Sequence, residues 1–101
     1  MEIARVIGTV VATRKDESLT GKKLLLVQPL DSKLFCQGNS KVIVDTVGAG
    51  TGELVLFVSG AASRNAVNRA DAAVDGAAVG IIDSVETDET WISHDRREDE
   101  S

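Results

Sequence analysis

The sequence is short of aromatic residues, with two phenylalanines, one tryptophan and no tyrosine among 101 residues. Large rings supply much of the buried area of most cores and ligand pockets, and single-stranded nucleic acid binds by stacking on them. A core of small aliphatic side chains buries less area, and small domains are already marginal in stability. The composition therefore disfavours a nucleic-acid-binding module and favours a subunit that buries further surface against copies of itself.

The sequence also lacks the residues that disulfides, metal sites and membrane spans require. Cys36 is the single cysteine, which excludes an intrachain disulfide and fits a reducing compartment. His94 is the single histidine, whereas metal sites need three or four ligands. The chain has no signal-peptide pattern at its start and no apolar run near the roughly 20 residues of a membrane span. We expect a cytoplasmic protein with no membrane segment, cofactor or metal.

The acidic excess is confined to the C-terminal end. Residues 1–85 contain nine acidic and nine basic side chains, and residues 86–101 contain seven acidic side chains and two arginines. A neutral body has no field that attracts phosphates, and an acidic segment repels them. We predict one domain over residues 1–86, an acidic tail over residues 87–101, and no nucleic-acid partner. Within the tail, Trp91-Ile92 forms either a docking spot or part of a frayed end.

The body has the pattern of a β protein. Residues 3–13 alternate a wholly apolar face with a mixed one, which is typical of a half-buried strand. Residues 61–70 form the one predicted helix, with Ser59 or Ser63 as its N-cap. Pro29 should end the second strand, since it cannot donate to a ladder. The predicted strands are residues 3–13, 24–27, 42–47, 54–58 and 79–85.

Five short strands with glycine-rich connections and one small helix predict a mainly β fold. The expected architecture is a small five-stranded barrel related to the oligonucleotide/oligosaccharide-binding (OB) fold. An OB-like binding module for nucleic acid or a small ligand is therefore the alternative to a self-assembling subunit.

The segment Gly48-Ala49-Gly50-Thr51-Gly52-Glu53 is the strongest candidate for a ligand site. A phosphate-binding loop needs a defined glycine spacing and opens a helix. Here the glycines alternate, a strand pattern follows, and Glu53 would repel an anion. We interpret the segment as a connection that needs positive φ or close backbone approach. A subunit seam or a narrow symmetric pore requires such close approach.

No other residues form a convincing catalytic set. Cys36 shows no sign of activation. Ser63-Arg64 could bind an anion, or Arg64 could pair with a carboxylate across a subunit boundary, which we favour. Four aspartates lie at strand ends or turns, where Asp commonly makes local hydrogen bonds. They are Asp45, Asp71, Asp75 and Asp83. The sequence therefore predicts no catalytic residues and no enzyme.

Read in order, four segments resemble the pentameric vertex proteins of bacterial microcompartments, the family shared by carboxysomes and ethanolamine-utilisation compartments. These segments are residues 4–13, 19–29, 44–56 and 79–85. Two places depart from the family pattern. Ser59 to Arg64 stands where a Gly-Ser-Ser-x-Arg-like stretch is usual, and Ala73 to Gly76 stands where a proline is usual.

The resemblance implies a β-barrel subunit that assembles into a cyclic homopentamer with a narrow central opening. Such pentamers close the corners of a cytoplasmic polyhedral shell that is otherwise tiled by hexameric shell proteins. The interface of a closed ring joins two different patches. We predict that residues 48–53, with Ser63 and Arg64, lie at subunit seams or at the axis.

Overall fold

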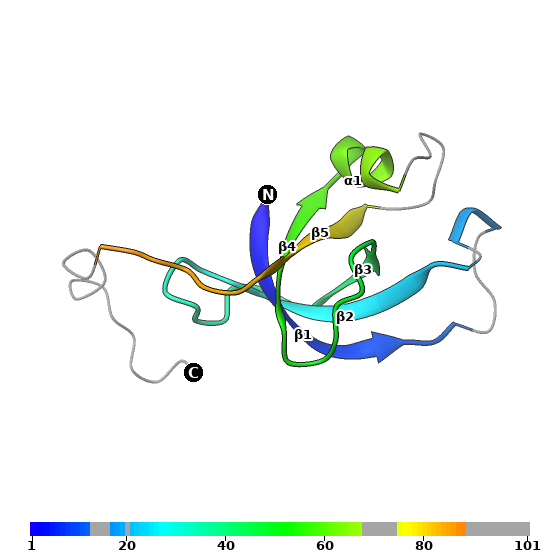
Figure 1. Cartoon of the computed structure of the whole chain (residues 1–101). Coiled ribbons are helices and arrows are strands. Elements are labelled where there is room, and N and C mark those ends of the chain that lie inside the picture. Colours follow the sequence, from blue (N-terminus) through cyan, green and yellow to red (C-terminus); the bar gives the residue numbers. More distant parts are fainter. Residues whose placement is uncertain (13–16, 20, 68–74, 89–101) are drawn as a thin grey trace.

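The computed structural model describes residues 1–12, 17–19, 21–67 and 75–88. Its five strands close into a barrel in the order β1-β2-β3-β5-β4 (Figure 1). The elements are β1 (Glu2–Val10), a short 3-10 helix (Glu17–Leu19), β2 (Lys23–Leu30), β3 (Lys41–Asp45), β4 (Leu54–Ser59), α1 (Ala61–Ala66) and β5 (Gly76–Ile82). The predicted fold class, a five-stranded barrel with one short helix, is confirmed.

The barrel interior is filled by small aliphatic side chains, as the composition indicates. Along β1, Ala4 and Val6 are fully buried while Arg5 and Ile7 are exposed, so the alternating pattern sets which face points inward. Phe57 is the largest buried side chain. The main core cluster contains Ala4, Val6, Leu25, Val27, Ile43, Ala49, Val55, Phe57 and Ala78.

The prediction that Pro29 ends the second strand is wrong. β2 continues to Leu30, and Pro29 pairs with Ala4 of β1. The pairing of β2 with β3 ends at Val27, so the missing N–H of Pro29 breaks no bond to β3. The Pro29 carbonyl accepts a hydrogen bond from the backbone N–H of Gln37, at 2.9 Å.

The predicted helix N-cap is also wrong. The N-cap is Gly60, whose φ of 64° is open to glycine at little cost, and no side chain caps the helix. Ser63 is instead a buried residue of α1, and its Oγ donates to the Gly60 carbonyl at 2.5 Å. α1 lies beside the end of β4, where Ala66 and Val67 join a second apolar cluster with Val58. Residues 68–70 of the predicted helix lie outside the described residues.

β5 begins at Gly76, three residues earlier than predicted, and crosses to run parallel to β3. Only two residue pairs join these strands, Val44 with Ala77 and Asp45 with Ala78. A Cβ atom on Gly76 would lie 2.7 Å from Cγ2 of Ile43, closer than real Cβ contacts allow. The approach of β5 to β3 therefore depends on glycine at this position.

Candidate functional site: the glycine-rich loop

The connection from β3 to β4, residues 46–53, contains the predicted glycine segment and is called the glycine-rich loop below. It lies at the opposite end of β4 from α1 (Figure 1). Ala49 of this loop is fully buried and belongs to the main core cluster. The loop is therefore anchored in the barrel and is not a loose surface excursion.

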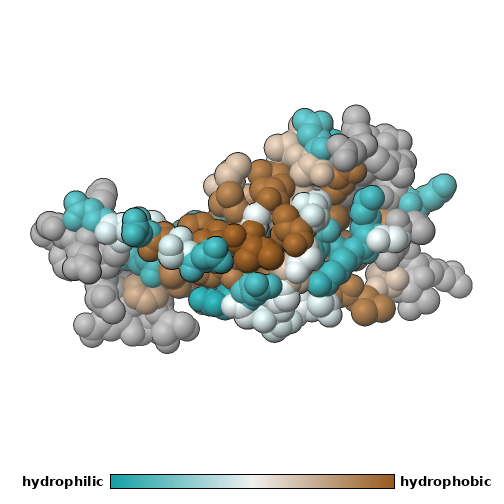
Figure 2. Space-filling view, in the orientation of Figure 1, coloured by the Kyte–Doolittle hydropathy of each residue, from teal (hydrophilic) through white to brown (hydrophobic). Residues whose placement is uncertain are grey.

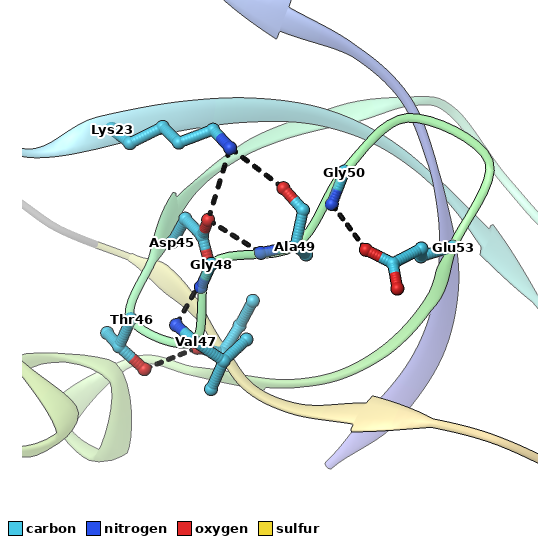
Figure 3. A network of polar contacts seen from close by, with 9 residues as sticks. Lys23, Asp45, Thr46, Val47, Gly48, Ala49, Gly50 and Glu53 are labelled. Carbon is cyan, nitrogen blue, oxygen red and sulfur yellow. Dashed lines mark hydrogen bonds and ion pairs between the residues drawn. The ribbon is translucent and has the colours of Figure 1, made fainter.

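The side chain of Asp45 organises the first half of the loop (Figure 3). Its Oδ1 accepts hydrogen bonds from the backbone N–H groups of Val47 and Gly48, at 2.9 and 3.0 Å, and its Oδ2 accepts one from Ala49 at 2.9 Å. The side chain is 1% exposed. The interpretation that this aspartate makes local hydrogen bonds is confirmed.

Lys23 at the start of β2 ties the same half of the loop to the sheet. Its Nζ lies 3.6 Å from Oδ2 of Asp45 and donates to the Ala49 carbonyl at 2.8 Å (Figure 3). Thr46 makes a further tie, because its Oγ1 donates to the Ala78 carbonyl of β5 at 2.6 Å. The sequence analysis predicted neither the Lys23–Ala49 hydrogen bond nor the Thr46–Ala78 hydrogen bond, because these bonds join residues that are 26 and 32 positions apart.

The second half of the loop is held by Glu53 and β1. The Glu53 carboxylate accepts a hydrogen bond from the Gly50 N–H at 2.6 Å. Val6 of β1 forms two backbone hydrogen bonds with the loop, its N–H donating to the Glu53 carbonyl and its carbonyl accepting from Gly52. Gly48 and Gly52 have φ values of 76° and 93°, so the prediction of positive φ is confirmed at these two glycines.

These hydrogen bonds occupy the amides that an anion would need. A phosphate-binding loop presents several free backbone N–H groups to its ligand. Here seven amides of the loop donate to acceptors within the chain, those of Thr46, Val47, Gly48, Ala49, Gly50, Gly52 and Glu53. The geometry disfavours a phosphate or nucleotide site and describes a rigid structural loop.

The remaining candidate residues lie apart from this loop. Ser63 and Arg64 are in α1, and β4 separates them from the loop by six residues, or roughly 20 Å of extended chain. Ser63 is buried, which leaves it unsuited to bind an anion from solvent. Arg64 is half-buried, and its side chain forms no ion pair or hydrogen bond with the residues that the structure describes.

The other polar candidates form no site in the described part of the chain. Asp75, Asp83 and Cys36 are exposed. Over residues 1–12, 17–19, 21–67 and 75–88, no three His, Cys, Asp or Glu side chains are grouped so that they could hold a metal ion. The helices within these ranges are too short or too polar to cross a membrane. Asp71, Trp91-Ile92 and His94 lie outside the described residues.

Comparison with known proteins assigns the family. The family model described as "Ethanolamine utilisation protein EutN/carboxysome" matches residues 1–83. The chain belongs to this EutN/carboxysome family. The resemblance seen in the four ordered segments is therefore confirmed, and the departures at residues 59–64 and 73–76 do not remove the chain from the family.

Relatives within the EutN/carboxysome family match this chain over nearly their whole length. The microcompartment shell vertex protein GrpN of Rhodospirillum rubrum is 49% identical over 87 residues, which are 86% of this chain and 98% of GrpN. PduN of Salmonella typhimurium, also a shell vertex protein, is 47% identical over 89 residues, covering 84% of this chain and 98% of PduN.

Solved structures of the same family share the barrel. A structure titled as the GrpN pentameric microcompartment shell protein from Rhodospirillum rubrum superposes with a TM-score of 0.79 at 49% identity, covering 87% of this chain and all of that chain. The structure of CcmL from Nostoc sp. PCC 7120 gives 0.80 at 45% identity, covering 85% of this chain and 93% of that one.

Proposed function

We propose that this chain is a structural shell protein, a homopentamer that caps the five-fold vertices of a polyhedral bacterial microcompartment in the cytoplasm. The observation that carries the proposal is the agreement of the barrel with a pentameric shell protein over that protein's full length, at 49% sequence identity. The occupied amides of the glycine-rich loop argue in the same direction, because they disfavour the alternative of a small-ligand module.

The proposed role is mechanical. A flat layer of hexameric tiles has no curvature, and a five-fold disc inserted at a corner supplies it. Sealing that corner limits leakage of intermediates from the compartment. The partners of this chain are then copies of itself within the pentamer and the hexameric shell proteins around it.

We further propose that residues 1–86 form the shell domain and that residues 87–101 are an appended acidic tail. The family match covers residues 1–83, and the last barrel strand ends at Ile82. Residues 83–88 follow without a helix or a strand. The seven acidic side chains of residues 86–101 thus come after the part of the chain that builds the barrel.

The residues proposed for subunit seams or the axis are Gly48, Ala49, Gly50, Thr51, Gly52, Glu53, Ser63 and Arg64. Ala49 and Ser63 are fully buried within the subunit, so they support such a seam from inside and do not contact a neighbour. Gly50 supports this placement, because its φ is not positive and a Cβ would meet only Oε1 of Glu53, at 3.4 Å. No strong constraint within the subunit therefore demands glycine there, whereas close approach of a neighbour would. Arg64 supports it as well, since it has no partner among the described residues and is available to a neighbouring carboxylate.

Gly50→Val tests both the seam and the vertex function when the chain is co-expressed with hexameric shell proteins. We expect the unmodified chain to give closed polyhedral shells and Gly50→Val to leave them open, because the added side chain blocks ring closure while the subunit still folds. Electron microscopy of the purified assemblies is the measurement. Ser40→Val is the control, since Ser40 is an exposed residue of another loop.

Two results would count against these proposals in different ways. If Gly50→Val closes shells as well as the unmodified chain does, the loop is not at a seam. If the unmodified chain leaves shell closure unchanged, the vertex function itself is wrong.

A further inference from the structure

One edge of β3 is paired over only part of its length. On one side, all of Lys41–Asp45 pairs with β2. On the other side, β5 pairs only with the last two residues of β3. The same register would place Asp75 opposite Val42, but the Asp75 carbonyl accepts a hydrogen bond from the N–H of Gly60 at 3.1 Å. This bond holds Asp75 beside the end of β4, so the first half of β3 has an open edge in the described part of the chain.

The main chain of Val42 points toward this open edge. Just past β3, the N–H of Thr46 donates to the Ala78 carbonyl of β5 at 3.3 Å. The N–H and C=O groups of a strand turn to the same neighbour at every second residue, so those of Val42 point the same way as those of Thr46. Over the described residues, no strand lies opposite Val42 on that side. Such a donor and acceptor on a strand edge form a template for another extended chain.

A hollow runs along the open edge. Its larger part has a volume of about 690 Å³ and lies between the start of β3 and the residues that join β4 to β5. A smaller part of about 120 Å³ shares Val42 and Ile43 and reaches Leu24. Val42 is 47% exposed, so the hollow presents an apolar side chain to solvent. We call it the β3 groove and define it by Lys41, Val42, Ile43, Phe57, Asp75 and Gly76.

The acidic tail contains a sequence whose spacing fits this groove. Trp91-Ile92 is the one adjacent pair of large apolar residues after β5, and Glu89 precedes Trp91 by two positions. In an extended segment, side chains two positions apart lie on one side, about 7 Å from each other. In the groove, Nζ of Lys41 lies 5.6 Å from the centre of the Phe57 ring. The acid and the indole of the tail therefore match the amine and the apolar floor of the groove.

We infer that the β3 groove binds the tail of a second copy of this chain as an added strand, with Trp91 over Val42 and Glu89 beside Lys41. The backbone of the tail supplies the donor and acceptor that the open edge lacks. The added strand also covers an edge that would otherwise pair with unrelated chains. The inference goes beyond the shell role, since any assembly of this chain brings a second tail to the groove.

The tail of the same subunit is too short to reach this groove. β5 carries the chain about 20 Å from Gly76 at the groove to Ile82. Residues 83–88 then continue away from α1 (Figure 1), and Figure 2 shows hydrophilic atoms at the outer end of this stretch, beyond the hydrophobic atoms over β4 and β5. Trp91 follows Asp88 by three residues, or about 10 Å of extended chain. That length does not retrace β5, so the tail must come from another copy.

Trp91 is the single tryptophan of the chain, so intrinsic fluorescence tests the inference directly. We expect the emission of the unmodified chain to lie at a shorter wavelength than that of the urea-unfolded chain. Val42→Glu should return it to the unfolded value, with folding checked by circular dichroism and mass by native mass spectrometry. Ile7→Glu is the matched control and should leave the emission unchanged, because Ile7 is 45% exposed and lies in β1, which β2 separates from β3.

A peptide of residues 86–96 tests the same contact in trans. The full-length Trp91→Ala variant contains no tryptophan, so the peptide then carries the only one. We expect the peptide emission to shift to a shorter wavelength as this variant is added. Lys41→Gln in the protein and Glu89→Gln in the peptide should each weaken binding roughly two- to five-fold. The two changes together should weaken it by less than the product of the single effects, because they remove the same ion pair.

The outcomes separate this inference from the proposed function. Emission at the unfolded wavelength from the unmodified chain, with no shift of the peptide, overturns the inference. A shift that survives Val42→Glu, or that Ile7→Glu also abolishes, overturns the groove as the place where Trp91 binds. If Val42→Glu does not fold, Val42→Ser takes its place. A pentamer with exposed Trp91 contradicts this inference alone, whereas docked Trp91 in a chain that is not pentameric contradicts the vertex proposal alone.

Discussion

Asp45→Ala is expected to lower the free energy of unfolding by about 3 kcal/mol, because it leaves three backbone amides without their acceptor, one in a buried residue and one in a half-buried residue. These are the N–H groups of Val47, Gly48 and Ala49. The loss corresponds to a fall of about 15 °C in Tm for a domain of this size. Urea unfolding at a fixed protein concentration, followed by circular dichroism, is the measurement.

Two further variants sharpen this prediction. Asp45→Asn keeps the shape but places an amide nitrogen against an N–H donor, so we expect it to recover only part of the loss. Asp83→Ala is the control, because Asp83 is exposed, and it should change stability by less than about 0.5 kcal/mol. Equal stabilities for Asp45→Ala and the unmodified chain would mean that the carboxylate does not organise the loop.

Gly76→Ala should destabilise the barrel by about 2 kcal/mol, since the new methyl group collides with a core side chain. Its Cβ would lie 2.7 Å from Cγ2 of Ile43 and 3.7 Å from the carbonyl oxygen of Val58. Ile43 is 2% exposed and cannot swing into solvent without opening the core. The same unfolding measurement applies.

A double variant shows whether this collision is the cause. Ile43→Ala removes the obstructing Cγ2 atom and should itself cost about 3 kcal/mol as a cavity. If the collision is real, the combination of Ile43→Ala with Gly76→Ala costs less than the sum of the two single changes. Strict additivity would place the effect of Gly76 elsewhere, for example in the backbone of β5.

The strands could be predicted from the sequence where one face of the sheet is buried. The alternation along residues 3–13 correctly marked Ala4 and Val6 as inward, because a period of two has only one arrangement against a core. The prediction for Pro29 was wrong because β2 can include a proline beyond the point where β3 stops pairing with it. The local sequence does not show where that pairing ends. The early start of β5 at Gly76 was missed for a similar reason, since it depends on the pairing of Gly76 with Ser59 of β4.

The glycine-rich loop was partly predictable. Its departure from phosphate-binding spacing and the charge of Glu53 indicated a structural connection, and the hydrogen bonds of Asp45 and Glu53 supply the physical reason. The link from Lys23 to Ala49 could not be predicted, because it requires the register of β2 against β3. The open edge of β3 could not be predicted either, because it depends on how far β5 pairs with β3.

The native mass of the purified protein tests the central claim most directly. Native mass spectrometry or light scattering should find a species of five chains, each of 10.7 kDa, that persists on dilution. That result would agree with a five-fold vertex subunit and would make the seam variant Gly50→Val interpretable. A stable monomer at every concentration would contradict the pentamer and, with it, the proposed place of this protein in a shell.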